Sequence, residues 1–326
     1  MRVRFASLLV FLLGLTGCTP FFFQPLDHHV YDPETAGLAY EDVTFEAVDG
    51  TKLHGWFFPA KGERVGSILF LHGNAENIST HFAGIVWAID GGFDAFVIDY
   101  RGYGLSDGTP SLDGVHLDAT AGLNALLAKP GIAPEEIVVF GQSLGGSIAL
   151  EAIAHHPQKN NLAGLVVEGA FSDYRGIVRE KLHEFWLTWA FQWPISLTID
   201  NRYDPKVAAA AIAPLPLLVI HGQQDRVVPP HHGTALFEAA GEPKAIWQPK
   251  EAAHISAFNS LSMRRRFLDH LTSLVDPEPA VAHSDDNHLP DDDHLLMPAS
   301  MVAEEALKAP YHESGQDPSK TASSAR

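Results

Sequence analysis

The feature that most constrains this chain is the alternation, across its middle, of short apolar runs with longer stretches of helical spacing. The apolar runs have the length and composition of buried strands. Such alternation predicts an α/β fold in which a mostly parallel sheet is covered by helices on both faces. The expected strands are 67–72, 95–99, 137–141, 165–168 and 217–221, and the expected helices are 112–128, 144–155, 230–240 and 256–274.

A β-hairpin comes before the alternating region, and an acidic tail follows it. Segments 43–48 and 52–58 are separated by Asp49-Gly50, a pair that favours a tight hairpin turn. Residues 276–326 hold 11 Asp and Glu against 3 Lys and Arg and are rich in Pro, Ser and Ala, which predicts a largely disordered tail. The folded domain is therefore expected over 41–275.

Charge and composition exclude some functions. The chain has a net charge of −18 and no basic stripe, so it lacks the electrostatic footprint of a protein that binds nucleic acid. In the tail, His283, His288 and His294 alternate with aspartates and offer at most weak binding of a divalent metal. A solvated acidic tail is the preferred interpretation, and the sequence implies no metal and no other cofactor.

The N-terminus has the pattern of an export signal. A basic start precedes an apolar stretch, 5–15, that is too short to span a bilayer. Leu15-Thr16-Gly17-Cys18 then resembles the lipobox of bacterial lipoproteins, which implies cleavage before Cys18 and lipidation of that cysteine. On this interpretation 1–17 is the signal peptide and 18–40 is a lipidated tether to the membrane. An ordinary cleaved signal peptide with a chance cysteine is the alternative.

Two neighbours of this motif refine the expectation. Thr19, rather than an aspartate, follows the cysteine, and by the same resemblance this favours the periplasmic side of the outer membrane. Cys18 is also the only cysteine in the chain, so no disulfide is expected.

A nucleophile motif lies between an expected strand and an expected helix. Gly141-Gln142-Ser143-Leu144-Gly145 fits the pattern G-x-S-x-G, and in this setting the pattern forms a sharp turn that exposes the serine hydroxyl. A serine hydroxyl is a weak nucleophile until a base takes its proton. Ser143 is therefore the expected nucleophile, and its partners are expected later in the chain.

Asp225 and His254 occupy the positions that such partners require. In folds built around this turn, the acid and then the histidine follow the serine in chain order. Asp225 comes just after the strand 217–221, and His254 follows a short strand, 245–248. A turn aspartate and a surface histidine are the plainer alternatives, but they do not account for the matched positions. We predict that His254 is the general base and that Asp225 orients it.

An oxyanion would need two backbone N–H donors. Leu144, the residue after the nucleophile, is expected to supply one. The loop that begins at His72-Gly73 is expected to supply the other, from Asn74 or, as the second choice, from Ala75. His72 itself is expected to shape this loop rather than to take part in catalysis.

Four segments together resemble one known family: 72–75, 99–106, 141–146 and 221–225. They are similar to the corresponding segments of the BEM46-like α/β-hydrolases, which include ABHD13-type and ABHD17-type proteins. The resemblance covers about 41–275 and implies the α/β-hydrolase fold and cleavage of an acylated or other small-molecule substrate. The stretch 99–106 is a structural signature of the family, in which Arg101 is expected to pair with a carboxylate.

An insert at about 172–204 is expected to form a small helical cap. Its segment 181–193, KLHEFWLTWAFQW, has the spacing of an apolar helix face that includes Trp186 and Trp189. Three interpretations stay open: a helix packed into the core, an acyl-binding wall over the nucleophile, and a surface that contacts membrane.

The sequence thus predicts a serine hydrolase that cleaves carboxylic esters or thioesters through an acyl-enzyme on Ser143. A serine aminopeptidase is the second enzyme hypothesis, and it needs an acidic site for the substrate's amino group. A lipoprotein scaffold with an inactive hydrolase fold is the hypothesis without catalysis.

Overall fold

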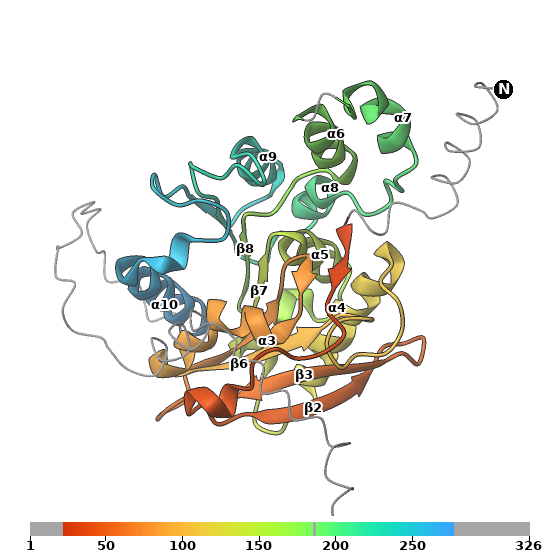
Figure 1. Cartoon of the computed structure of the whole chain (residues 1–326). Coiled ribbons are helices and arrows are strands. Elements are labelled where there is room, and N and C mark those ends of the chain that lie inside the picture. The colour runs from red at the N-terminus through yellow and green to blue at the C-terminus, as the bar shows by residue number, and fades with distance from the viewer. Residues whose placement is uncertain (1–21, 185–186, 277–326) are drawn as a thin grey trace, which may run out of the picture.

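The computed structural model describes residues 22–184 and 187–276, and their main feature is an eight-stranded sheet (Figure 1). The strand order is β10-β9-β8-β7-β4-β6-β3-β2. Strands β4 and β6 to β10 run parallel, whereas β3 is antiparallel to both β6 and β2. The strands are β2 (Glu41–Glu46), β3 (Lys52–Phe58), β4 (Gly66–Leu71), β6 (Phe93–Asp99), β7 (Ile137–Gln142), β8 (Gly164–Glu168), β9 (Leu217–Ile220) and β10 (Lys244–Trp247).

Helices cover both faces of this sheet, which confirms the predicted α/β class. One buried cluster joins the sheet to α4, α5, α8 and α9, and a second joins the other face to α10 and the short turns η2 and η3. Because both faces are covered, strands β4 and β6 to β9 are buried along their whole length, as their continuous apolar sequences require. The helical elements are α3 (Ile78–His81), α4 (Leu112–Leu127), α5 (Leu144–Ala154), α8 (Pro205–Ala210), α9 (His231–Ala239), α10 (Leu261–Val275), η2 (Phe82–Gly84) and η3 (Val86–Gly91).

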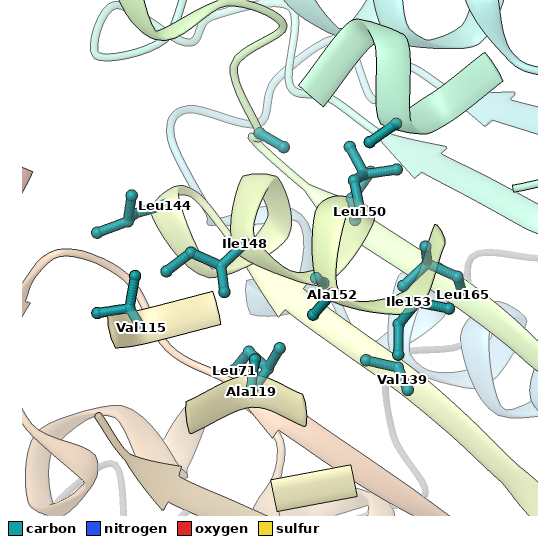
Figure 2. Close-up of a cluster of buried hydrophobic side chains, with 14 of the residues drawn as sticks. Leu71, Val115, Ala119, Val139, Leu144, Ile148, Leu150, Ala152, Ile153 and Leu165 are labelled. Atoms are coloured by element: carbon teal, nitrogen blue, oxygen red, sulfur yellow. The ribbon is translucent and has the colours of Figure 1, made fainter. Parts of the chain in front are cut away.

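Helix α5 is the most deeply packed of these helices. Figure 2 shows its apolar side chains, among them Ile148 and Ile153, between those of α4 and the sheet. Val115 and Ala119 of α4 face them from one side, and strands β4, β7 and β8 contribute Leu71, Val139 and Leu165. Such close packing leaves a helix little freedom to shift. The N-terminus of α5 is therefore held in place, together with Ser143, the residue directly before it.

The N-terminal part of the described chain packs on the domain. Phe22 and Phe23 are buried in the cluster around α4 and α5. The next residues form β1 (Gln24–Pro25), which pairs in parallel with β5 (Ala75–Glu76). The described part of the tether predicted over 18–40, residues 22–40, is therefore not an extended linker but packs on the domain, where Phe22 and Phe23 are buried. Cys18 and the predicted signal peptide lie outside the described residues, as does 277–326.

The cap insert is helical, but not as one helix over 181–193. Helix α6 spans Tyr174–Glu184, and residues 187 and 188 form a turn in which the hydroxyl of Thr188 donates to the carbonyl oxygen of Leu182 at 2.7 Å. A short turn, η6 (Trp189–Phe191), and helix α7 (Gln192–Leu197) follow, at the top of Figure 1. Among the described residues no helix has the length and hydropathy needed to cross a membrane.

Candidate active site

Ser143 lies on a strained turn between β7 and α5. Its φ of 55° and ψ of −119° fall outside the usual regions for a residue with a side chain. The flanking glycines permit the turn: a Cβ at Gly141 would lie 2.4 Å from the carbonyl oxygen of Gly145, and one at Gly145 would lie 2.1 Å from that of Leu71. The predicted strand–turn–helix setting of G-x-S-x-G is therefore present, and the serine stands at the carboxyl end of β7.

A chain of hydrogen bonds joins Ser143, His254 and Asp225. His254 Nε2 lies 2.9 Å from Ser143 Oγ, and His254 Nδ1 lies 2.8 Å from Asp225 Oδ2. Asp225 follows β9 and His254 follows β10, so three strand ends supply the three side chains. Because a carboxylate only accepts, Nδ1 carries the proton and Nε2 is left to accept the hydroxyl proton of Ser143.

The surroundings of Asp225 keep it ionised. Its Oδ1 accepts the backbone N–H groups of Val227 and Val228, each at 2.8 Å. Burial works to raise the pKa of Asp225, but the hydrogen bonds from His254 and from Val228 outweigh it, and the pKa falls below its usual value. The ring of His221 supports the same loop by donating to the carbonyl oxygen of Val228 at 2.8 Å. Asp225 is thus fixed as an acceptor facing His254.

Glu168, at the end of β8, is a part of this site that the sequence analysis missed. Its backbone carbonyl accepts the N–H of Ser143 at 2.8 Å and so holds the strained turn. Its buried carboxylate accepts from Gln142 Nε2 at 2.7 Å and from the N–H of Ala257 at 3.0 Å. Burial raises the pKa of Glu168 despite these bonds. The available signal was its position, since β8 ends beside β7 and pairs Gln142 with Glu168.

The two expected oxyanion donors belong to two segments that approach Ser143, the start of α5 and the loop after β4. Leu144 is the first residue of α5, where helix geometry leaves the N–H without a partner inside the helix. The loop after β4 passes close by, because a Cβ on Gly73 would lie 3.7 Å from Ser143 Cβ. Asn74 follows in that loop, and its carbonyl oxygen accepts from Tyr103 Oη at 2.7 Å and from the N–H of Gln24 at 2.9 Å. Those two bonds fix the orientation of the loop, and the sequence analysis found neither.

His72 has the structural place that was expected for it. Its ring is fully buried, stacks against His81 and contacts Tyr100 and Tyr103. Burial lowers the pKa of His72 to about 3, so the ring is neutral. Its Nδ1 donates to the carbonyl oxygen of Gly73 at 2.8 Å. His72 therefore shapes the start of the loop.

Arg101 pairs with carboxylates, as predicted for the stretch 99–106. Its guanidinium contacts Asp118 at 2.8 to 3.0 Å through two nitrogen atoms and Asp49 at 2.8 Å through a third. This ties the loop after β6 to α4 and to the hairpin turn between β2 and β3.

The exposure of the aromatic residues in the cap bears on the three interpretations of the insert: core helix, acyl-binding wall and membrane-contacting surface. Trp189 is 54% exposed, so the interpretation of a helix packed into the core is wrong for it. Trp186 lies outside the described residues. An open cavity of about 540 Å³ lies beside the cap, and its lining includes Trp193, Glu180 and Glu184 but neither Trp189 nor Ser143. The structure thus leaves Trp189 on the surface of the cap.

Comparison with known proteins assigns the chain to a family. A family model described as serine aminopeptidase, S33, matches residues 62–211. The protein YfhR of Escherichia coli (strain K12) is 32% identical over 79% of this chain and 88% of its own length. The chain belongs to the α/β-hydrolase superfamily, and its mostly parallel sheet with helices on both faces is the fold of that superfamily.

Two further similarities have a narrower meaning. The bem46 protein of Schizosaccharomyces pombe is 26% identical over 68% of this chain and 73% of its own length. The esterase Pf2001 of Pyrococcus furiosus superposes with a TM-score of 0.60 over 78% of this chain and 96% of its own, at 18% identity. At that identity the second similarity concerns the fold alone.

Proposed function

We propose that this protein is a serine hydrolase that cleaves carboxylic esters or thioesters through an acyl-enzyme on Ser143. The observation that carries the proposal is the continuous path from Ser143 Oγ through His254 to Asp225, at 2.9 and 2.8 Å. Nothing in this path requires a metal or another cofactor. The motif loops and the relationship to bem46 further favour the BEM46-like branch of the superfamily.

The proposed reaction follows from the positions of these groups. His254 Nε2 takes the proton of Ser143 as Oγ attacks the acyl carbon, and Asp225 stabilises the imidazolium that forms. The N–H groups of Leu144 and Asn74 hold the oxyanion of the tetrahedral intermediate. His254 returns the proton to the leaving alcohol or thiol. Water, activated by the same base, then releases the acid from Ser143.

A labelling experiment tests this proposal. A fluorophosphonate probe should react covalently with the wild-type protein at Ser143 and leave Ser143→Ala unlabelled. A screen of p-nitrophenyl esters, acyl thioesters and aminoacyl amides should then give turnover in the wild type only. An unlabelled wild-type protein without turnover on any of these substrates would support the inactive scaffold instead.

A serine aminopeptidase is the second candidate, and the cavity beside the cap favours it. Glu180 and Glu184 line this cavity and supply the acidic groups that an amino terminus needs. Both oxygens of Glu180 already contact imidazoles, Oε1 that of His231 at 3.1 Å and Oε2 that of His232 at 3.2 Å, and Arg179 lines the same cavity. These partners weaken the case, so ester cleavage is preferred. Glu180→Gln should raise KM for aminoacyl amides only if the second candidate is correct.

We also propose that the protein is anchored to a membrane through lipid on Cys18, on the periplasmic side of the outer membrane. Cys18 is four residues from Phe22, a reach of at most about 14 Å. The ring of Phe22 contacts that of Tyr174, the first residue of the cap helix α6, with centroids 5.2 Å apart. An anchor at Cys18 would therefore hold the cap close to the bilayer.

The surface of the cap suits that position. No charged residue occurs in 185–199, in a chain of net charge −18, and Trp189, Phe191 and Trp193 are exposed there. Tryptophan favours the membrane–water interface. In a Gram-negative host the wild type should fractionate with membranes and incorporate labelled palmitate, and Cys18→Ser should lose the label. Soluble, unlabelled wild-type protein would exclude the anchor.

A flotation assay separates the cap from the anchor. Cys18→Ser should retain weak binding to vesicles of phosphatidylethanolamine and phosphatidylglycerol, and adding Trp193→Ser should abolish it. Val48→Ser is the matched control, because Val48 is also exposed but lies in the turn between β2 and β3, outside the cap. Equal binding by Cys18→Ser alone and by the two double variants that add Trp193→Ser or Val48→Ser would show that the cap does not contact the membrane.

A further inference from the structure

A second cluster of titratable side chains lies behind the loop that carries Asn74. His29, His54 and Asp99 each offer a ligand atom, and these atoms lie within 4.8 Å of one another. They come from the N-terminal segment, from β3 and from the end of β6, so no short sequence motif connects them. None of the three takes part in the proposed reaction.

The hydrogen bonds of His54 leave one ring nitrogen directed at Asp99. Nε2 lies 2.8 Å from Asp42 Oδ1, and since a carboxylate only accepts, Nε2 carries the hydrogen and donates. Nδ1 lies 3.8 Å from Asp99 Oδ2 and has no hydrogen-bond partner in the described part of the chain. The side chain of His54 is 8% exposed, so water does not replace the missing partner freely. A buried ring nitrogen that faces a carboxylate at this distance is satisfied either by a second proton on the ring or by a metal cation between the two atoms.

Asp99 supplies the negative charge for such a cation. The carboxyl group is fully buried, and each of its oxygen atoms lies within hydrogen-bond distance of a nitrogen atom. Its Oδ2 lies 3.1 Å from His29 Nε2, and its Oδ1 accepts the N–H of Ile78 at 2.9 Å. The chain passes so close here that a Cβ on Gly104 would lie 1.9 Å from Oδ2.

We propose that His29 Nε2, His54 Nδ1 and Asp99 Oδ2 bind one divalent transition-metal ion of the zinc class, which clips the N-terminal segment to the sheet. In tetrahedral zinc sites with bonds of about 2.0 to 2.1 Å, neighbouring ligand atoms are roughly 3.3 Å apart. The two separations from Asp99 Oδ2, 3.1 and 3.8 Å, lie on either side of that value. Two imidazoles and one carboxylate form a ligand set that suits zinc, and a water molecule would complete it.

The outer contacts of the cluster fit the same assignment. A histidine that binds a metal through one ring nitrogen commonly donates its other N–H to a carboxylate, as His54 does to Asp42. Binding of the metal would release the proton that otherwise lies between His29 Nε2 and Asp99. The water at the fourth coordination position would lie on the side of His29, because His29 is the most exposed of the three side chains.

The metal would stabilise the loop that the proposed oxyanion site uses. His29 belongs to the segment that starts at Phe22 and is already bonded to this loop: Leu26 donates its N–H to the carbonyl oxygen of Glu76 at 3.1 Å. Asn77 Nδ2 donates in turn to the carbonyl oxygens of Leu26 and His28, at 3.0 and 2.6 Å. A clip at His29 would therefore restrain Asn74 through both strands of the β1–β5 pair.

Metal binding and melting temperature test the proposal on the full-length chain. Protein freed of metal with a chelator should take up one equivalent of Zn²⁺ tightly, with a melting temperature that rises by several degrees. His29→Ala should lose both the tight equivalent and the rise. His28→Ala is the matched control, because His28 is adjacent and exposed, and it should behave as the wild type. No tight equivalent in the wild type, or equal uptake by His29→Ala, would overturn the proposal.

Two further measurements locate the ion. Glu180→Gln should keep the tight equivalent, since Glu180, His231 and His232 form the other described group able to hold a metal. In the wild-type chain, carbethoxylation followed by mass spectrometry should show His29 protected by Zn²⁺ while His28 reacts equally with and without it. This readout does not depend on the folding of a variant. Loss of binding in Glu180→Gln, or no protection of His29, would assign the ion elsewhere.

Discussion

The carboxyl edge of the sheet and the cap insert differ in how far their side chains are buried and bonded within the chain. At the sheet edge every side chain of the site has a hydrogen-bond partner: Ser143, His254, Asp225 and Glu168. Both carboxylates, Asp225 and Glu168, are buried. In the cap, Leu187, Trp189, Phe191, Trp193 and Leu197 are more than half exposed. The edge is thus determined by contacts within the chain. The cap has apolar surface that the described chain does not cover, which is typical of a region that meets something outside it.

The largest expected effect concerns the sheet edge. Asp225→Asn should keep the fold but lower kcat by on the order of 10⁴, because the amide cannot hold His254 in the tautomer that leaves Nε2 free to accept. Ester turnover at saturating substrate measures this, and Ser143→Ala gives the floor. A loss of less than tenfold in Asp225→Asn would show that the hydrogen bond to His254 does not matter for the reaction.

Replacing one buried and one exposed tryptophan compares how much each kind of region contributes to the free energy of unfolding. Trp87 is buried against Phe258 and Phe267, so Trp87→Ala should lower the free energy of unfolding by about 3–5 kcal/mol. Trp189→Ala should change it by less than about 1 kcal/mol, since the side chain is largely solvated. Urea unfolding at one pH measures both. Equal losses would mean that Trp189 packs against part of the chain that is not described here.

Trp189→Ala also tests substrate selection. If Trp189 lines an acyl channel, Trp189→Ala should shift the preferred chain length in a series from acetate to laurate, by about a factor of four in kcat/KM for each methylene that the ring contacts. Because the side chain of Trp189 is 54% exposed on the surface of the cap, we expect the profile to stay unchanged. A shift toward longer acyl groups would restore the acyl-wall hypothesis.

The buried carboxylate beside Ser143 should make stability depend on pH. Its pKa is raised in the folded state, so Glu168 contributes stability that is present below about pH 4.5 and is lost as the pH rises through the folded value. Glu168→Gln lacks this dependence, and the difference in unfolding free energy between wild type and variant should therefore shrink from pH 5 to pH 8. Glu46→Gln, at an exposed position on β2, should show a constant difference. A gap that widens with pH would contradict the raised pKa.

The smallest expected effect concerns the acidic tail. Ending the chain after Pro277 should leave the melting temperature within about one degree and the esterase activity unchanged, because a segment of this composition has little apolar surface to bury. Differential scanning calorimetry and a p-nitrophenyl ester assay measure the two. A loss of several degrees would mean that the tail docks on the domain.

The sheet edge was predictable because local patterns fix it. Ser143, Asp225 and His254 each follow their own strand, and parallel strands end at one edge whatever their order in the sheet. Glu168 was missed because its role depends on β8 lying beside β7, and strand order cannot be deduced from hydrophobic runs. The N-terminal segment was misjudged because its partner, the loop after β4, is some 50 residues away in sequence.

The cap shows a different limit of sequence patterns. Helical spacing over 181–193 indicated helix, which the structure has in 181–184 and again from 189 onward, yet the periodicity of apolar residues cannot tell which of them the chain itself covers. It also could not detect the break between α6 and α7, where the Thr188 side chain takes the carbonyl of Leu182.

The pairing of β1 with β5 also determines how the molecule bears mechanical load. Any pull on the chain from its N-terminal side reaches the aromatic pair Phe22-Phe23 first and then the backbone bonds from Gln24 and Leu26 to the loop at Asn74 and Glu76. The sheet itself lies further along the load path, beyond residue 40. The loop at Gly73 and Asn74, which lies beside Ser143, would therefore be displaced before any strand of the main sheet. Tension at the N-terminus would then lower turnover at forces that leave the domain folded.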